Sequence, residues 1–315
     1  MTKRAYYVVD AFTAQPFAGN AAAVVLDCEG LDAANMQAIA AEFNLSETTF
    51  VLPPSIPDPS RSTEEAAHEV RFRWFTPGME VDMCGHATIA GVRALAEAGR
   101  MRAPADGESV RVRIETRSGW LTAFLERLPG DEAGWMIWLD LIDPRLHEHP
   151  LDRASLAEML RLPVDAFERS IPIVETQDRD VLVFVKDTRV LGDARPDFAV
   201  LGDLMRKERL RGMSLATTKT LTPSIHVQSR FFAPAAGVDE DPVTGSVHGP
   251  LAAYVVQQGF VPIHDDLAGL TCVQSKAGGR AGLVNALVQR QGANEYAVRI
   301  GGRTFVSMVG VLHVK

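Results

Sequence analysis

Hydrophobic and polar positions alternate along several short segments of the chain, and this alternation predicts β-strands. In residues 70–74 the apolar residues Val, Phe and Trp alternate with two arginines, which is typical of a strand with one buried face. Turn-forming residues bound many of these segments. The same criteria predict strands at residues 6–10, 22–26, 48–52, 110–115, 121–126, 135–141, 171–175, 181–186, 283–289, 295–300 and 305–314.

Apolar residues at three- and four-residue intervals predict a smaller number of helices. The clearest amphipathic helix spans residues 32–43, and Asn44 is suited to ending it. Further helices are expected near residues 154–160 and 200–209. Residues 53–68 are rich in Pro, Ser and charge, so we expect an exposed loop there.

Two long segments repeat one pattern. Residues 70–99 and 227–259 each run through an alternating strand, an aromatic pair, a proline loop, a glycine followed by a polar residue, and a helix rich in small residues. Gly85 and Gly245 hold the same place in the two copies. Small residues around most of a helix are expected where a sheet wraps it closely. Because repeated units that need a partner usually pack face to face, the repeat predicts one cleft lined by both halves.

Length and pattern together predict two domains of an α+β protein. A chain of 315 residues is long for a single core and suits two domains of roughly 150 residues each. Strands that alternate with two buried helices favour an α+β fold. We place the first domain at residues 1–118, completed by a C-terminal strand at 302–315, and the second at residues 119–301.

Composition narrows the classes of partner. The formal net charge of −8 argues against nucleic acid or an anionic membrane as partner, because both need a basic surface. The N-terminal residues lack the apolar core of a signal peptide, and no apolar run approaches the roughly 20 residues that span a bilayer, so we expect a cytoplasmic protein. The three cysteines are far apart and lack CxxC spacing, which indicates neither a disulfide framework nor a zinc site.

Glu47 is the first candidate for acid/base chemistry. It lies between a predicted helix and a predicted strand, among Phe43, Leu45 and Phe50. Partial desolvation there would raise the pKa of the carboxyl toward neutrality, where it can both accept and donate a proton. The alternative is an ordinary surface glutamate.

The two repeated helix entries carry the other candidates. Gly85 and His86 open the first small-residue helix, and Gly245 and Ser246 open the second, shortly after Asp241. Backbone N–H groups at a helix start bind anions, and glycine lets a ligand approach the backbone. Each loop alone also fits ordinary helix capping. The repetition of a glycine plus a polar residue favours a shared ligand.

Cys84, next to Gly85, offers a different chemistry. A helix start lowers the pKa of a thiol, so Cys84 is a candidate base or nucleophile. A two-base racemase needs a second acid/base across the cleft, and the repeated loop carries Asp241 without a cysteine near it. We therefore expect a packed small side chain at Cys84. No other cluster has metal-ligand spacing, since residues 147–149 lack the HExxH pattern.

Several of these segments together resemble the PhzF family, the phenazine-biosynthesis-like isomerases. This family shares its fold with diaminopimelate epimerase and proline racemase. The matching stretches include RWFTPGMEVDMCGHATIAG and DEDPVTGSVHGPLAAY. All the matching stretches lie, in the family's order, at residues 9–26, 44–51, 73–91, 116–123 and 239–254.

The resemblance implies two pseudo-symmetric domains, each a mixed β-sheet rolled around a central helix, with the active site between them. It also implies cofactor-independent proton-shift chemistry. By this resemblance Glu47 moves the proton, while His86, Asp241 and Ser246 hold the substrate and Gly85 and Gly245 supply backbone contacts. The chain departs from the family's pattern at Ala21, where proline is usual, and in its late signature at residues 274–275 and 279–282.

The sequence therefore predicts an isomerase that moves a proton between carbons of a small carboxylate-bearing substrate. We expect no metal or other cofactor, and a homodimer is compatible with the resemblance. Two alternatives remain open. One is a racemase or epimerase that uses the single thiol of Cys84. The other is a protein that binds a small ligand, or acts as a scaffold, without turnover.

Overall fold

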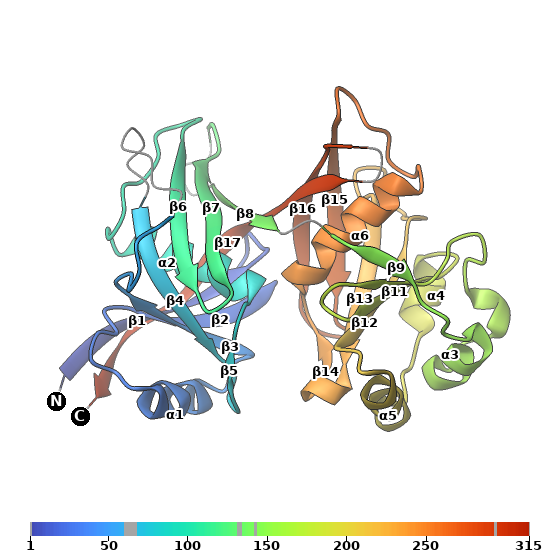
Figure 1. Ribbon diagram of the computed structural model, residues 1–315, viewed down its shortest axis with the longest axis horizontal. Helices are drawn as coiled ribbons and strands as arrows, with labels where there is room; N and C mark the ends of the chain where they lie inside the picture. Colours follow the sequence, from blue (N-terminus) through green and yellow to red (C-terminus); the bar gives the residue numbers. More distant parts are fainter. Residues whose placement is uncertain (1, 60–67, 131–133, 142–143, 293–294, 315) are drawn as a thin grey trace. The chain divides into compact units, whose positions relative to one another are not determined.

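The chain divides into two compact units, which are described here one at a time. A computed structural model describes residues 2–59, 68–130, 134–141, 144–292 and 295–314 (Figure 1). The first unit comprises Met1–Asp140 with Gly301–Lys315, and the second comprises Leu141–Ile300. The boundary expected after residue 118 coincides with a turn between two strands of the first unit. Within the described part of the chain, no helix has both the length and the apolar character needed to cross a membrane.

The first unit is a sheet of mixed strand direction. β2 runs parallel to β3, β3 antiparallel to β4, β4 parallel to β6, and β6 antiparallel to β7, while β5 pairs with the end of β4. β1 pairs antiparallel with β2 and with β17. The elements are β1 (Thr2–Ala11), β2 (Asn20–Val25), α1 (Ala33–Phe43), β3 (Glu47–Leu52), β4 (His68–Phe75), β5 (Glu80–Val81), α2 (Gly85–Glu97), β6 (Ser109–Thr116), β7 (Gly119–Arg127), β8 (Trp135–Leu141) and the second part of β17 (Tyr296–Val314).

The central helix of this unit is α2. It is buried along almost its whole length and contacts β1, β2, β3, β4 and β7. Its small side chains make this possible, since a Cβ at Gly91 would lie 2.6 Å from the ring of Phe72 on β4. The prediction of a helix wrapped closely by sheet is confirmed.

The helix α1 follows its predicted course and covers a small apolar core. Asp32 caps its N-terminus by accepting a hydrogen bond from the backbone N–H of Asn35 at 2.8 Å. Asn44 ends it in the left-handed region, with φ of 49°. Met36 of α1 is fully buried in a cluster with Phe50 and residues of neighbouring strands.

The second unit repeats the strand order of the first. β11 runs parallel to β12, β12 antiparallel to β13, β13 parallel to β15, and β15 antiparallel to β16, while β14 pairs with β13. The buried helix α6 contacts β15 and β16. The elements are β9 (Leu146–Glu148), α3 (Arg153–Leu160), β10 (Val174–Thr176), β11 (Asp180–Phe184), α4 (Thr188–Asp193), α5 (Phe198–Glu208), β12 (Gly212–Thr217), β13 (Val227–Ala233), β14 (Val238–Asp241), α6 (Gly245–Gln257), β15 (Leu267–Ser275), β16 (Ala281–Arg290) and the start of β17.

An ion pair beneath each helix entry confirms the repeat at the level of side chains. In the first unit Arg73 Nε on β4 lies 2.7 Å from Glu80 Oε1 on β5. In the second unit Arg230 Nε on β13 lies 2.7 Å from Glu240 Oε1 on β14. Each pair links the strand before the loop to the short strand that leads into the helix. The predicted α+β fold, with a mixed sheet around a central helix in each half, is confirmed.

Two errors of the sequence prediction have identifiable reasons. Residues 295–300 and 305–314 were expected as separate strands, but β17 is continuous through Gly301 and Gly302. Those glycines leave room for aromatic rings, because a Cβ on Gly301 would clash with Trp138 and one on Gly302 would lie 2.5 Å from Phe12. The strand β12 went unpredicted because all its residues are buried and nothing alternates.

The segment at residues 53–68 is only partly the exposed loop that was expected. Asp58 is buried, and its Oδ2 accepts a hydrogen bond from Arg113 Nε at 2.5 Å. The backbone N–H of Ser55 donates to Glu115 Oε2 at 2.5 Å. Two side chains of β6 thus hold the beginning of the segment against the sheet. Residues 60–67 lie outside the described residues.

Candidate active site

Glu47 and His86 meet in the first unit. Glu47 is the first residue of β3, and His86 is the second residue of α2. The distance between Glu47 Oε2 and His86 Nε2 is 3.2 Å, and Ser46 Oγ lies 3.3 Å from the same nitrogen. The fold therefore joins a carboxylate from a strand start to an imidazole from a helix start.

The carboxylate of Glu47 makes few hydrogen bonds to the described residues for a group that is so little exposed. Its side chain is 20% exposed, and Oε2 is buried without a hydrogen bond of good geometry, even to the nearby imidazole. Buried polar atoms in proteins are nearly always hydrogen-bonded, and leaving one unpaired costs about 1–3 kcal/mol. An oxygen kept in this state is available to an additional donor, such as the proton of a ligand.

The loop before β2 supports this pair. Gly19 has φ of +60°, and a Cβ there would clash with the carbonyl of Ala11, so only glycine suits the position. The loop delivers the buried Asn20, whose Oδ1 accepts a hydrogen bond from Ser46 Oγ at 3.4 Å. Ala21, which replaces the usual proline, lies in the regular ladder of β1 and β2 opposite Asp10.

Cys84 caps α2 without using its sulfur to do so. It is the N-cap residue, is buried, and makes no side-chain cap hydrogen bond. Its Sγ instead lies 3.4 Å from His86 Nδ1, on the other side of the ring from Glu47. The corresponding cap of α6 is Thr244, so the second helix start has no thiol. Burial raises the pKa of Cys272, on β15, to about 12, which rules it out as a second thiolate.

In the second unit, Asp241 is tied to the cap of α6. Thr244 Oγ1 donates to Asp241 Oδ2 at 2.5 Å. The buried Gln274 on β15 completes the arrangement, since its Nε2 donates to the carbonyl of Asp241 at 2.8 Å and its Oε1 accepts from the backbone N–H of Thr244 at 3.0 Å. Gln274 thus fixes the loop that precedes Gly245 and Ser246.

Ser246 has an unexpected partner. Arg211, the residue before β12, donates from Nη2 to Ser246 Oγ at 3.0 Å. The same guanidinium forms a bidentate pair with Asp180, with 2.9 Å between Arg211 Nε and Asp180 Oδ1. Asp180 is completely buried, which raises the pKa of its carboxyl, while Arg211 opposes that rise.

His248, two residues further along α6, is a structural group. Its ring is fully buried, and this desolvation lowers its pKa to about 4, against smaller opposing effects of Thr244 and Asp241. Because the ring is neutral, Nδ1–H donates to the carbonyl of Thr244 at 2.7 Å. His248 therefore stabilises the start of α6 and carries no charge near neutral pH.

Among the residues that the structure describes, one group could hold a metal ion. The ligand atoms of Glu47, Cys84 and His86 all lie within 4.8 Å of one another. Oxygen, sulfur and nitrogen donors of this kind are accepted by zinc. The same three side chains that could transfer protons could thus also bind a soft cation, so metal independence is a prediction to be tested.

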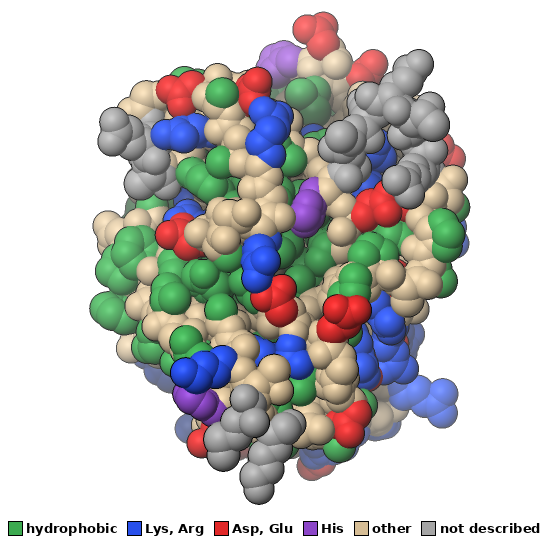
Figure 2. All heavy atoms as spheres, turned by 90° about the vertical axis from the view of Figure 1, so that its left-hand side faces the viewer, with side chains coloured by type: hydrophobic (Ala, Val, Ile, Leu, Met, Phe, Trp, Pro, Cys, Tyr) green, Lys and Arg blue, Asp and Glu red, His purple; other side chains and the backbone are tan. Residues whose placement is uncertain are grey.

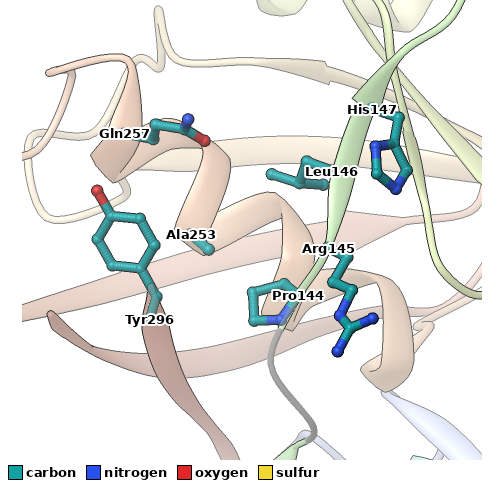
Figure 3. Close-up of a pocket in the computed structure, with 7 residues that line it drawn as sticks. All are labelled: Pro144, Arg145, Leu146, His147, Ala253, Gln257 and Tyr296. Atoms are coloured by element: carbon teal, nitrogen blue, oxygen red, sulfur yellow. The ribbon is translucent and has the colours of Figure 1, made fainter. Parts of the chain in front are cut away.

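A pocket elsewhere in the second unit contains none of these residues. It has a volume of about 320 Å³ and lies at β9 and the far half of α6 (Figure 3). Ala253 and Gln257 line it, roughly 10 and 16 Å along the helix from Ser246. Its lining residues are Pro144, Arg145, Leu146, His147, Ala253, Gln257 and Tyr296.

Each unit thus gathers its own predicted residues. Glu47, His86 and Gly85 lie together in the first, and Asp241, Gly245 and Ser246 follow one another at the α6 start in the second. Asp180, Arg211 and Ser46 were not predicted, because no local pattern marks them. Gln274 stood in a segment that matched the family only partly.

Comparison with known proteins identifies the family of the chain. The profile of the PhzC-PhzF family, described as phenazine biosynthesis-like protein, matches residues 9–310. An uncharacterized isomerase of Deinococcus radiodurans is 33% identical, with 97% of this chain and 94% of that protein covered. The trans-2,3-dihydro-3-hydroxyanthranilate isomerase of Pseudomonas aeruginosa is 31% identical, with 94% and 95% covered.

Solved structures extend the likeness to the fold. A PhzF-family phenazine biosynthesis protein of Bacillus anthracis superposes with a TM-score of 0.84 at 28% identity, with both chains fully covered. A hydroxyproline epimerase of Agrobacterium vitis superposes with a TM-score of 0.63 at 13% identity, covering 98% of this chain and 92% of that one, which shows a shared fold alone. The family profile covers nearly the whole chain, and the protein therefore belongs to the PhzC-PhzF family of isomerases.

Proposed function

We propose that the protein moves a proton between two carbons of a small carboxylate-bearing substrate, with Glu47 as the general acid/base and without a cofactor. The observation that carries this proposal is the buried Glu47 Oε2, which lies 3.2 Å from the imidazole of His86 and has no further polar partner among the described residues. General acid/base groups need such reach and a protonation state that can change near the working pH.

The reaction is a balanced transfer. The carboxylate of Glu47 takes a proton from a substrate carbon, the C–H electron pair enters the adjacent π system, and Glu47 becomes a carboxylic acid. It then returns the proton to another carbon of that system, which restores the carboxylate. His86 holds a polar group of the substrate beside Glu47, in a position that Cys84 and Ser46 help to fix.

The substrate's carboxylate is held in this proposal by the two helix starts. Gly85 opens α2, and Gly245 and Ser246 open α6. Free backbone N–H groups and the positive end of the helix dipole stabilise an anion at such places. We propose that Gly85, Asp241, Gly245 and Ser246 contact the substrate, as the resemblance implies. Such a site needs no net basic charge.

The test is solvent isotope incorporation. Because the related Pseudomonas aeruginosa enzyme is named for trans-2,3-dihydro-3-hydroxyanthranilate, this compound is the first to incubate with the protein in D2O. Nuclear magnetic resonance then detects both the isomer and deuterium at carbon. The exposed Glu42 on α1 provides a matched control variant, Glu42→Gln, that should behave as the unmodified protein. Isomerisation without any exchange, under conditions where Glu47 is open to solvent, would contradict a shuttling carboxylate.

A one-thiol racemase or epimerase is the second candidate, favoured by the 3.4 Å contact between Cys84 Sγ and His86 Nδ1. Substitution Cys84→Ala separates the two functions. With Glu47 as the shuttle, the turnover number should fall by less than about tenfold, because the change removes one of the contacts that position His86 and leaves the proton-transfer group in place. A loss as large as that expected of a missing acid/base, about a hundredfold or more, would favour the thiol.

The remaining expectations concern partners and location. We propose a cytoplasmic protein that acts on a small molecule and not on nucleic acid. On the face shown in Figure 2, basic side chains are interspersed with acidic and hydrophobic ones, without the broad basic surface that nucleic acid requires. Met308, Val309 and Val311 are exposed on β17, and we propose a homodimer, which sedimentation of the purified protein would test.

A further inference from the structure

The chain of contacts from Asp180 through Arg211 to Ser246 links a buried carboxylate to a proposed substrate contact. The side chain of Asp180 is 1% exposed, whereas that of Arg211 is 38% exposed. Arg211 therefore has one face fixed by a buried anion and another near solvent. Its Nη2 donates to Ser246 Oγ at the start of α6.

The internal repeat identifies the residue of the first unit that corresponds to Arg211. β3 begins at Glu47 and β12 begins at Gly212, and the registers Thr48 with Phe75 and Met213 with Phe232 align the two strands. Arg211 consequently occupies the place that Ser46 holds in the first unit. Both residues contact the second residue of the following buried helix, which is His86 in one unit and Ser246 in the other.

The two units carry different chemical groups at corresponding positions of the repeat. Where the first unit has the carboxylate of Glu47, the second has Gly212, and a side chain there would clash with the ring of Phe231. In the register of β11 and β12, Asp180 lies opposite Gly212, as Ala22 lies opposite Glu47 in the first unit. The second unit has thus exchanged a proton-transfer group for a cation held by a buried anion.

The direction of the hydrogen bond determines what Ser246 can do. A guanidinium has only donors, so Ser246 Oγ must accept from Arg211. The hydroxyl proton of Ser246 then remains for another acceptor, and the charge-assisted bond polarises it. Since a hydroxyl in this state favours an acceptor with negative charge, Ser246 is set to donate to an anionic oxygen.

We propose that Arg211, fixed by Asp180, is a positioning residue that makes Ser246 a donor and thereby selects a substrate carboxylate at the start of α6. This inference rests on the proposed function, which assigns Ser246 to the substrate. Beyond that function, it identifies Arg211 as the group that makes the protein prefer a substrate acid to its neutral analogue. Lysine cannot replace Arg211, because an ammonium lacks the planar fork that holds Asp180 and Ser246 together.

The test compares acids with their amides by calorimetry. The probes are trans-2,3-dihydro-3-hydroxyanthranilate, 2-aminobenzoate and benzoate, each alongside its carboxamide. The unmodified protein should bind at least one acid about tenfold or more tightly than its amide, and Arg211→Gln and Ser246→Ala should each remove most of that preference. The double variant should show no further loss, because the two residues act as one unit. Arg189→Gln, at an arginine 90% exposed on α4, is the matched control.

Arg211→Gln leaves Asp180 buried without its cation and risks misfolding. The pair Asp180→Asn with Arg211→Gln removes both charges together, and Arg211→Lys keeps a cation, so both should fold and both should lose the acid preference. A purely structural ion pair would lower the melting temperature and leave the preference intact, which would overturn the proposal. Additive losses in the double variant, or no acid preference in the unmodified protein for any probe, would also overturn it.

The role of Arg211 and the proposed role of Glu47 can be contradicted independently of each other. Substitution Glu47→Gln should leave the preference for acid over amide unchanged, because Glu47 acts on a carbon-bound proton. An intact acid preference with no isomerisation or isotope exchange would contradict the role of Glu47 alone. Isotope exchange that depends on Glu47, with an acid preference that survives in Arg211→Gln, would contradict the role of Arg211 alone.

Discussion

Substitution Glu47→Gln tests the proposed chemistry with little disturbance of the structure. Glutamine has the same size and shape as glutamate, but its amide cannot exchange a proton with a carbon. Because glutamine keeps the size of this side chain, which is 20% exposed, the change opens no cavity, and an amide atom takes the place of Oε2 at 3.2 Å from His86 Nε2. We expect the free energy of unfolding to change by no more than about 0.5 kcal/mol.

The expected loss of activity follows from the role assigned to the carboxylate. General acid/base catalysis contributes about a hundred- to ten-thousandfold, which corresponds to about 3–5 kcal/mol in the activation barrier. Binding should persist, since His86 and the two helix starts remain. The turnover number should therefore fall by at least about a hundredfold, with the affinity for the substrate changing by less than about tenfold.

The assay is the appearance of product and of deuterium at carbon, followed by nuclear magnetic resonance for Glu47→Gln, the control Glu42→Gln and the unmodified protein. Calorimetry on the same samples measures binding, and thermal unfolding confirms that all three are folded. Activity within a few-fold of the unmodified protein would remove Glu47 from the mechanism. Loss of binding together with activity would show that Glu47 holds the substrate instead of moving its proton.

Three further predictions use other parts of the structure. Gly245→Val should weaken carboxylate binding about tenfold or more, because a branched side chain crowds the approach to the backbone of α6, and unchanged affinity in calorimetry would contradict this. Dialysis against a chelator should leave activity intact, and loss that a metal ion restores would show that the Glu47, Cys84 and His86 group is a metal site. Acid should destabilise the protein through His248: below pH 6.5 the unfolded imidazole binds a proton, while the buried ring stays neutral until its pKa of about 4, so about 3 kcal/mol is lost across that window. Denaturant titrations of His248→Asn should show a flatter dependence on pH, and an identical dependence would contradict the assignment.

The fold was predictable where the sequence repeats itself or alternates. The two glycine-initiated helices, the alternating strand β4 and the helix between Asp32 and Asn44 all follow from local pattern. Elements buried on both faces left no pattern to detect, as in β12. Glycines misled the analysis where they accommodate a ring, as at Gly301 and Gly302, since glycine in a sequence more often marks a turn.

Residues of the candidate site were predictable where a reactive side chain lies at the start of a helix or strand. Glu47 and His86 stood out because their neighbours in sequence are apolar or small. Arg211 did not, because it ends a segment already rich in charge and its two partners are brought to it only by the pairing of β11 with β12 and by the packing of α6. Contacts between residues distant in sequence require the fold to be known.

The pairing of β1 with β17 has a consequence for the order of synthesis. β1 precedes the second unit along the chain and β17 completes the first unit after it, and Thr2 lies opposite Val314 in the ladder. The second unit is one continuous stretch, Leu141–Ile300, so it can fold as it leaves the ribosome. The first unit has to wait for β17, and until then one edge of β1 remains open to pairing with other chains. Loss of the part of β17 beyond Ile300 would therefore damage the half of the molecule that was translated first, the half that contains Glu47.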